Sequence, residues 1–158
     1  MVDFAILAAV PLEHLRSGLD VCRDRGHVTL QSHKRELFRD VERRRGRDLV
    51  PVLLYPSRDP ERRRSSFRVT WTAMCFGSTD DLRAKRREER GGHRPPTTRR
   101  YPEDRSDRVA VFWFVKNLRR LPEAEQVPIG RLSSYRTSRR RRSSAPRGPE
   151  LVRRPDWI

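Results

Sequence analysis

Short apolar runs, separated by strongly charged segments, set the pattern of this chain. Phe4–Val10 is continuously apolar and has the length of a buried strand rather than of a helix. Residues 27–31 (HVTLQ) alternate between apolar and polar side chains, which predicts a second, short strand. Leu49–Tyr55 is apolar apart from Pro51. Because Pro51 has no backbone N–H, it predicts that this third strand lies at a sheet edge or contains a bulge.

Two later stretches predict the centre of a sheet. Phe67–Phe76 (FRVTWTAMCF) has the period of two that a strand requires, and Val109–Val115 (VAVFWFV) is apolar on both faces, as a central strand is. These are the most apolar strands of the chain, so we expect them to be buried and adjacent. A partly buried continuation follows over residues 118–132, and Pro149–Ile158 is long enough for a closing strand.

One or two helices are expected between the first strands. Pro11 stands where a helix can begin, and the apolar spacing after it predicts a short amphipathic turn or helix that ends near Gly18. Ser32 can cap a second helix over residues 33–45, which Gly46 would end.

Two segments lack the apolar residues of a core. Residues 78–108 predict a long basic loop, partly disordered, and residues 133–148 form a low-complexity Arg/Ser segment. The remaining elements are mainly short strands with one or two short helices. This pattern predicts a single α+β domain over residues 1–158, built as a small mixed β-barrel rather than a doubly wound sheet.

The charge balance points to a polyanionic partner. The chain has 37 Lys and Arg against 21 Asp and Glu, a net charge of +16, with the excess gathered in residues 83–105 and 131–158. A field of this sign attracts nucleic acid or an anionic surface. Only Lys34, Lys85 and Lys116 are lysines. A GC-rich genome would also favour Arg over Lys, so part of the bias can reflect composition alone.

Membrane insertion and secretion are not expected. No apolar run approaches the roughly 20 residues of a spanning helix, and the first run lacks the basic flank and cleavage site of a signal peptide. Cys22 and Cys75 are the only cysteines and form no CxxC pair, which excludes a disulfide framework and a four-cysteine zinc site. We therefore predict a cytoplasmic protein without a membrane partner.

The sequence offers little catalytic chemistry. It contains no GxGxxG, GxSxG, P-loop or HExxH motif. A zinc site is conceivable from His14, Cys22 and His33, but the spacing of these residues matches no common ligand pattern. Asp80 and Asp81 are better explained as a turn cap than as an acid/base pair. We expect no catalytic residues, no metal and no cofactor.

Four segments, taken in order, resemble the EVE domain, a branch of the PUA-like barrels related to YTH domains. They are Glu13–Arg16 with Gly18 after the first strand, Ser32–Lys34 at a helix start, Gly46–Asp48 before an apolar strand, and Thr72–Met74 followed by Gly77. The resemblance covers residues 4–77 and, more loosely, 109–158. It implies a small barrel with a pocket, near the end of the first strand, in which aromatic side chains hold a single base.

What the resemblance implies for the site can be stated residue by residue. The base-binding pocket would be formed by His14, Ser32, His33, Lys34, Tyr55, Trp71 and Trp113. A base needs an aromatic face for stacking and a few hydrogen bonds along its edge. For Trp71 and Trp113, a place in the core is the alternative that strand position alone favours.

The basic runs are the candidates for the phosphate backbone. Arginines at phosphates release counterions, which gives affinity without sequence specificity. The candidate phosphate-binding residues are Arg43, Arg44, Arg99, Arg100, Arg139, Arg140, Arg141 and Arg142.

The sequence therefore predicts a non-enzymatic nucleic-acid-binding module that takes one flipped base, modified or unmodified, into an aromatic pocket. DNA and RNA remain equal alternatives, and the oligomeric state stays open. A metal-dependent nuclease or other small enzyme is a second hypothesis, for which acidic pairs such as Glu103-Asp104 would have to gather. A third is an RNA- or ribosome-associated adaptor that acts through its Arg-rich tail.

Overall fold

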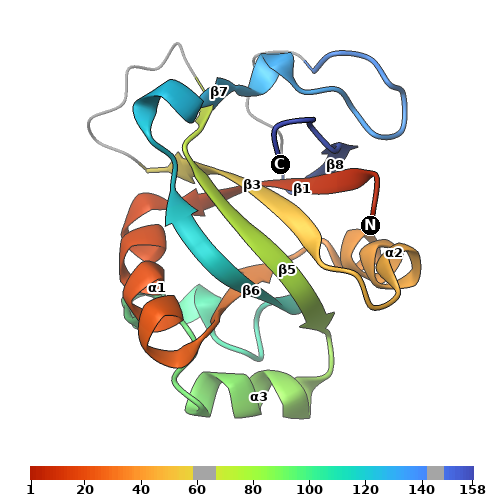
Figure 1. Cartoon of the computed structure of the whole chain (residues 1–158). Coiled ribbons are helices and arrows are strands. Elements are labelled where there is room, and N and C mark those ends of the chain that lie inside the picture. The colour runs from red at the N-terminus through yellow and green to blue at the C-terminus, as the bar shows by residue number, and fades with distance from the viewer. Residues whose placement is uncertain (59–66, 142–147) are drawn as a thin grey trace.

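A six-stranded, mostly antiparallel sheet with three α-helices organises the residues described by this computed structural model, which are 1–58, 67–141 and 148–158 (Figure 1). The sheet order is β2-β6-β5-β3-β1-β8. The strands are β1 (Phe4–Pro11), β2 (Val28–Ser32), β3 (Val50–Ser57), β5 (Trp71–Thr79), β6 (Val111–Arg120) and β8 (Glu150–Arg153). The helices are α1 (Leu12–Arg25), α2 (Arg35–Arg45) and α3 (Leu82–Arg90). Two short strands, β4 (Arg68–Val69) and β7 (Val127–Pro128), pair separately.

The three helices and the mostly antiparallel sheet confirm the predicted α+β class. The sheet is open, so the expectation of a closed barrel is wrong. Among the described strands, β2 and β8 are the edges, at opposite ends of the sheet order. β2 pairs with β6, and β8 has only four residues, which pair with β1. Helices α1 and α2 flank the sheet at its two ends (Figure 1) and add side chains such as Leu15 and Phe38 to the core. One face of the sheet is thus covered by α-helices, and the other by segments outside them, which contribute Val69, Ile129 and Leu132.

The predicted pairing of the two most apolar strands is confirmed. β5 and β6 run antiparallel from Trp71, opposite Arg120, to Thr79, opposite Phe112, with irregularities on the way. Both faces of the sheet are buried. On β3, Val52 and Leu54 belong to one core cluster while Leu53 belongs to the other. This two-sided burial is why the strands read as continuous apolar runs.

The third strand is central, which corrects the edge prediction made from Pro51. β3 lies between β5 and β1 in the sheet. Pro51 faces Met74 on β5, while the pairing of β3 with β1 begins one residue later, at Val52. The missing N–H therefore falls at the start of the strand, where a proline is tolerated.

Helix α1 continues past Gly18 to Arg25 and ends at Gly26, whose φ is +87°. Gly18, the predicted stop, lies inside this helix, where a Cβ would be in ordinary contact with Pro95 and Val28 at 3.4 Å. Helix α2 ends before Gly46, as predicted.

The segment 78–108 is not the long loop that the sequence predicted. It contains α3 and two short 3₁₀ helices, η1 (Pro96–Arg100) and η2 (Pro102–Asp104). As expected, Asp81 acts as a cap: its carboxylate accepts a hydrogen bond from the Ala84 N–H at 2.9 Å. Further along, Lys85 Nζ donates to the Val109 carbonyl at 2.6 Å. Buried polar contacts, rather than an apolar stripe, order this segment, so hydrophobic periodicity gave no indication of it.

The C-terminal part folds back onto the first strand. β8 pairs antiparallel with β1, confirming the closing strand, and Ser134 forms an isolated bridge with Val152. Residues 142–147 of the predicted Arg/Ser segment lie outside the described residues. Among the described helices, none combines the length and apolar character needed to cross a membrane.

Candidate functional site

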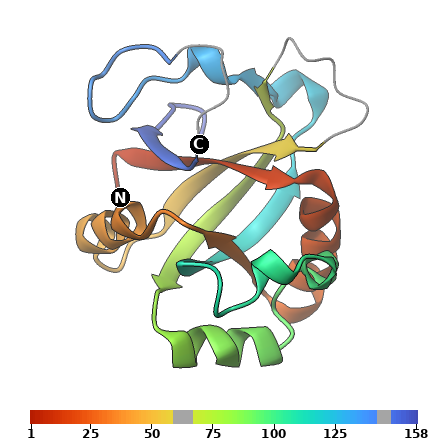
Figure 2. The same cartoon turned by 180° about the vertical axis from the view of Figure 1, so that it is seen from behind.

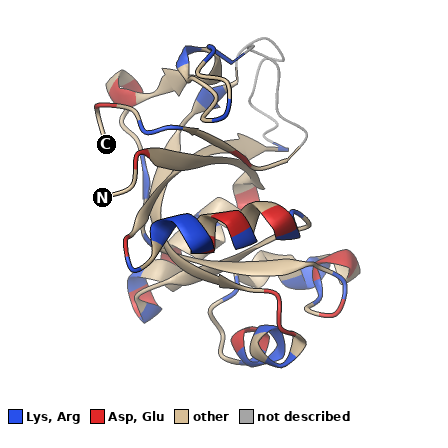
Figure 3. Cartoon of the chain, turned by 90° about the vertical axis from the view of Figure 1, so that its right-hand side faces the viewer, with Lys and Arg blue, Asp and Glu red and all other residues tan. Residues whose placement is uncertain are grey.

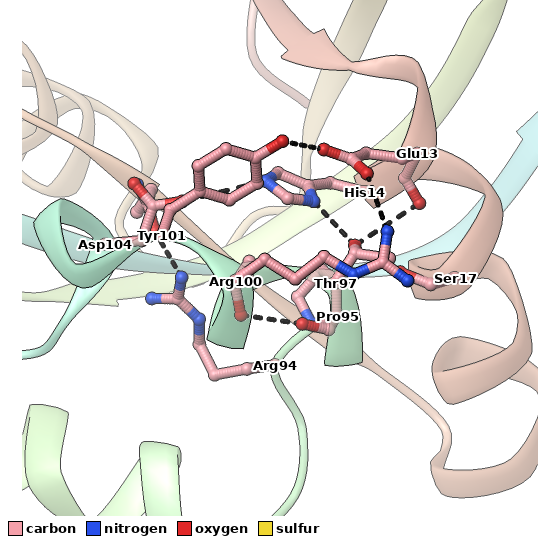
Figure 4. Close-up of polar contacts among 11 residues, drawn as sticks. Glu13, His14, Ser17, Arg94, Pro95, Thr97, Arg100, Tyr101 and Asp104 are labelled. Atoms are coloured by element: carbon pink, nitrogen blue, oxygen red, sulfur yellow. Dashed lines mark hydrogen bonds and ion pairs between the residues drawn. The ribbon is translucent and has the colours of Figure 1, made fainter.

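A cavity of about 200 Å³ opens where the ends of β1 and β3 meet β2 and the two 3₁₀ helices. This is smaller than the 300–1,000 Å³ typical of drug-sized ligands and suits a single small ring system. Figure 2 shows the segment after α3 passing beside β2, and Figure 4 shows the polar side chains that it contributes. The lining residues include Val10, Pro11, His14, Thr29, Leu30, Gln31, Arg58, Arg94, Pro95, Thr98, Tyr101, Glu103 and Asp104.

Arg94 is the most unusual residue of this wall. It is only 8% exposed, and its guanidinium lies 4.4 Å from the centroid of the Phe112 ring. One terminal nitrogen donates to the Gln31 side-chain oxygen, while Nε and the other terminal nitrogen have no partner within the described residues. Burial lowers the pKa of Arg94 to about 10, against the attraction of Asp104 and Glu89. The group is therefore a buried cation, short of acceptors, at neutral pH.

Asp104 supplies acceptor oxygens on the same wall. Its Oδ1 accepts from Gln31 Nε2 at 2.5 Å, and its Oδ2 lies 3.6 Å from His14 Nε2. The other ring nitrogen of His14 is hydrogen-bonded to Thr97 Oγ1 at 2.6 Å. Burial lowers the pKa of His14 below its usual value, despite the nearby Glu13 and Asp104 carboxylates. His14 is thus held as a neutral imidazole between two fixed partners at pH 7.

Tyr101 provides the aromatic side of the cavity. Its hydroxyl donates to Glu13, which holds the pKa of that carboxyl below and the pKa of the phenol above its usual range (Figure 4). The Tyr101 ring meets the His14 ring edge-on, at 5.5 Å between centroids. Arg58 lies 5.3 Å above the same ring, and Arg100 reaches Glu13 at 3.4 Å. The surroundings of the Tyr101 side chain therefore include two cations and a carboxylate.

The predicted aromatic pocket is not assembled by this structure. Trp71 and Trp113 are 4% and 1% exposed and belong to one core cluster, and Tyr55 belongs to the other. The core alternative therefore describes both tryptophans. Both tryptophan side chains are therefore enclosed by the core and do not face a ligand.

Of the other predicted pocket residues, only His14 lines the cavity. Ser32 is buried at the end of β2, where its hydroxyl accepts from the Lys34 N–H at 3.0 Å, and His33 is exposed. Lys34 lines a different groove, beside α2, together with Arg43 and Arg44. The turn into α2 thus directs these residues away from the cavity.

The predicted phosphate-binding arginines fall into three places. Arg99 and Arg100 lie on η1, beside the cavity, and Arg99 lines an adjoining groove that shares Arg94 and Tyr101 with it. Arg43 and Arg44 both pair with Asp40 on α2, where charges of both signs alternate (Figure 3).

The remaining candidates lie in the C-terminal part. Arg139 and Arg140 are exposed, Arg141 pairs with Glu150, and Arg142 lies outside the described residues. Arg99 and Arg100 are therefore the candidates that the fold places next to the cavity.

Sequence reasoning did not assign Gln31, Arg94, Tyr101 or Asp104 to a pocket, and it considered Asp104 only as part of an acidic pair. Three of them come from the stretch RPPTTRRYPED (residues 94–104), which has few apolar residues and was expected to be loop. The one feature of this stretch that could have indicated a binding site was a tyrosine among arginines and prolines. Within the described residues, His14, Cys22 and His33 form no group of possible metal ligands, whereas His27, Glu88 and His93 do.

Comparison with models of known protein families returns no match, and a search of curated protein sequences also returns none. The chemistry of the site is therefore inferred from its geometry.

Proposed function

We propose that this protein binds nucleic acid and takes a single unpaired base into the cavity beside η1 and η2. The observation that carries the proposal is a cavity of about 200 Å³ whose wall contains a buried arginine short of hydrogen-bond acceptors. A buried cation without acceptors is costly, so an acceptor-bearing ligand gains from contact with Arg94. Because its two unpaired nitrogens are themselves covered, the Arg94 side chain must shift to meet the ligand.

The remaining wall suits the edge and face of a base. Asp104 carries acceptor oxygens, Gln31 an acceptor and a donor, and Arg94 donors. Gln31 is now paired with both Asp104 and Arg94, so a base would exchange its own edge for these internal contacts. Arginine pairs well with the adjacent acceptors of a purine edge, as its bidentate contacts with guanine illustrate. Tyr101 supplies an aromatic face for stacking.

The surroundings of the cavity support binding of the backbone. Arg58, Arg99 and Arg100 lie at or beside its wall, and the whole chain carries a net charge of +16. Positive charge around a single-base site attracts the flanking phosphates. The cavity lies at the end of β1, where the resemblance to EVE domains implies a pocket. That resemblance remains part of this proposal, as does a cytoplasmic location.

The structure gives less support to a nuclease. Asp81 caps α3, and Asp80 pairs with Arg39 at 3.0 Å, so this acidic pair is engaged elsewhere. Asp104 is occupied by Gln31 and His14.

A binding measurement on single-stranded oligonucleotides tests the proposal. The set differs at one central position, which is an unmodified base, a methylated base or an abasic site, in both DNA and RNA. Stacking is worth about 1–3 kcal/mol per base, so the preferred base should bind about 5- to 150-fold more tightly than the abasic site. Fluorescence anisotropy gives the affinities.

The matched variants are Arg94→Lys, which keeps the charge but loses the planar fork, and Arg47→Lys, at an exposed position beyond α2. Only Arg94→Lys should abolish the preference for a base over the abasic site. Equal affinity of the unmodified protein for all oligonucleotides would overturn the cavity as a base site.

A further inference from the structure

Three possible metal ligands from separate parts of the chain converge beside α3. His27 directly precedes β2, Glu88 lies on α3, and His93 follows the turn that ends this helix. Their ligand atoms all lie within 4.8 Å of one another. His27 Nε2 is 3.6 Å and His93 Nδ1 is 3.9 Å from the same oxygen, Glu88 Oε2. One carboxylate oxygen thus faces two imidazole nitrogens.

The three side chains are held in place by the surrounding structure. Thr29 Oγ1 donates to Glu88 Oε2 at 2.8 Å, and the Thr29 N–H donates to the His93 carbonyl at 2.8 Å. A glycine with φ of +75°, Gly92, makes the turn that returns His93 toward Glu88. The His27 ring also packs edge-on against Phe76 at 5.3 Å. Such supporting contacts orient metal ligands in known sites.

The two imidazoles that face Glu88 also lie close to each other. Their rings are stacked, 4.0 Å apart between centroids and 10° from parallel. A neutral imidazole has one nitrogen lone pair that a cation can take. The side chains of His27, Glu88 and His93 are 23%, 26% and 25% exposed, so the group is reachable from solvent.

The spacing is close to that of a tetrahedral metal site. With bonds of about 2.0–2.2 Å to nitrogen and oxygen, ligand atoms around Zn²⁺ lie about 3.4 Å apart. The two oxygen–nitrogen separations of 3.6 and 3.9 Å need to shorten by a few tenths of an ångström. The stacked rings must also turn, because each lone pair lies in its ring plane and both have to point at one ion. We propose that His27, Glu88 and His93 form a divalent transition-metal site that binds Zn²⁺ through two imidazole nitrogens and one carboxylate oxygen, with the fourth position open to water.

The donor set selects the class of metal. Two imidazoles favour Zn²⁺ and neighbouring transition metals, whereas Mg²⁺ and Ca²⁺ prefer sites made of oxygen. The single carboxylate contributes one negative charge, and Arg25, which donates to the Gly91 carbonyl at 3.1 Å, opposes it. Moderate rather than extreme affinity is expected. A bound ion would join α3 and its following turn to β2, independently of the base cavity.

Isothermal titration of the tag-free full chain with Zn²⁺ alone tests this proposal. One equivalent should bind, and Glu88→Gln and His93→Gln should each weaken binding at least tenfold. Glu88→Gln keeps an oxygen for Thr29, which preserves the local hydrogen bond. The matched controls are Glu36→Gln and His33→Gln, at exposed positions near the start of α2, and these should leave the affinity unchanged. Circular dichroism of each variant verifies its fold.

Titration with Co²⁺ adds a spectroscopic readout. With Co²⁺ bound, the unmodified protein should show the intense visible absorption of a four-coordinate ion. Added Zn²⁺ should displace the Co²⁺ and abolish this absorption, whereas excess Mg²⁺ should leave it unchanged. The proposal is overturned if Glu88→Gln and His93→Gln, folded, bind Zn²⁺ within twofold of the unmodified chain. It is equally overturned if Co²⁺ shows only the weak spectrum of the hydrated ion.

Discussion

The guanidinium of Arg94 lies over the ring of Phe112, with its central carbon 4.4 Å from the ring centroid. The aromatic face replaces part of the hydration that this cation loses on burial. It does not satisfy the N–H groups, two of which have no acceptor within the described residues. The fold thus maintains a charged group under conditions that cost stability, which is typical of a binding site.

Arg94→Met tests that interpretation. Arg94→Met removes the cost of a buried cation with two unpaired N–H groups, which offsets the loss of its hydrogen bond to Gln31. We expect the free energy of unfolding, measured by urea denaturation, to change by no more than about 1 kcal/mol. Preference for a base over an abasic site should nevertheless be lost. A loss of several kcal/mol with binding retained would assign Arg94 a structural role instead.

The pH dependence of stability should report His14. Burial lowers its pKa in the folded protein, whereas in the unfolded chain it titrates near 6.5. Above pH about 6.5 both states are neutral, and as the pH falls the unfolded state binds the proton first. Stability from this group is therefore present above pH about 6.5 and is lost as the pH falls through the folded pKa.

His14→Gln is the comparison for this effect. Urea unfolding between pH 7.5 and 5 should show a smaller decrease in stability for the variant than for the unmodified protein. Parallel curves would mean that His14 does not titrate differently in the two states.

Trp71→Ala should act on stability rather than on recognition. Trp71 is 4% exposed and belongs to the main core cluster. Truncation of a buried aromatic residue costs about 3–5 kcal/mol, because packing is lost and a cavity remains. Urea denaturation measures the loss. A stable Trp71→Ala protein with weakened base binding would restore Trp71 to the pocket.

The salt dependence of nucleic-acid binding should locate the phosphate contacts. For single strands, each neutralised phosphate adds about 0.7 to the slope of log K against log salt concentration. Replacing both Arg99 and Arg100 with Ser should reduce the slope by about 1.4 if each contacts one phosphate. Arg43→Ser, on a helix where Asp40 already pairs with this arginine, serves as the control and should leave the slope unchanged. If the double variant and Arg43→Ser reduce the salt slope equally, the phosphate contacts do not lie specifically at Arg99 and Arg100.

Several elements of the fold follow from local pattern. Phe67–Phe76 and Val109–Val115 were predicted as buried, adjacent strands, and the pairing of β5 with β6 confirms this. The end of α2 follows the prediction, because Gly46 ends the helix as local backbone preferences require. Its start does not, since the helix begins at Arg35 and its N-cap is Lys34 rather than the predicted Ser32. Asp81 caps α3 because a short acidic side chain at that position accepts from the backbone locally.

The tertiary structure alone decided the rest. The sheet is open because β2 pairs with β6 and β8 pairs with β1, choices between strands far apart in the chain that no local pattern encodes. Helix α3 and the turns after it are ordered by buried polar groups such as Lys85 and Arg94. Hydrophobic periodicity detects apolar faces, so a segment anchored by charges reads as loop. The candidate site lies in that segment, where its geometry depends on contacts across 60 to 90 residues rather than on neighbours in sequence.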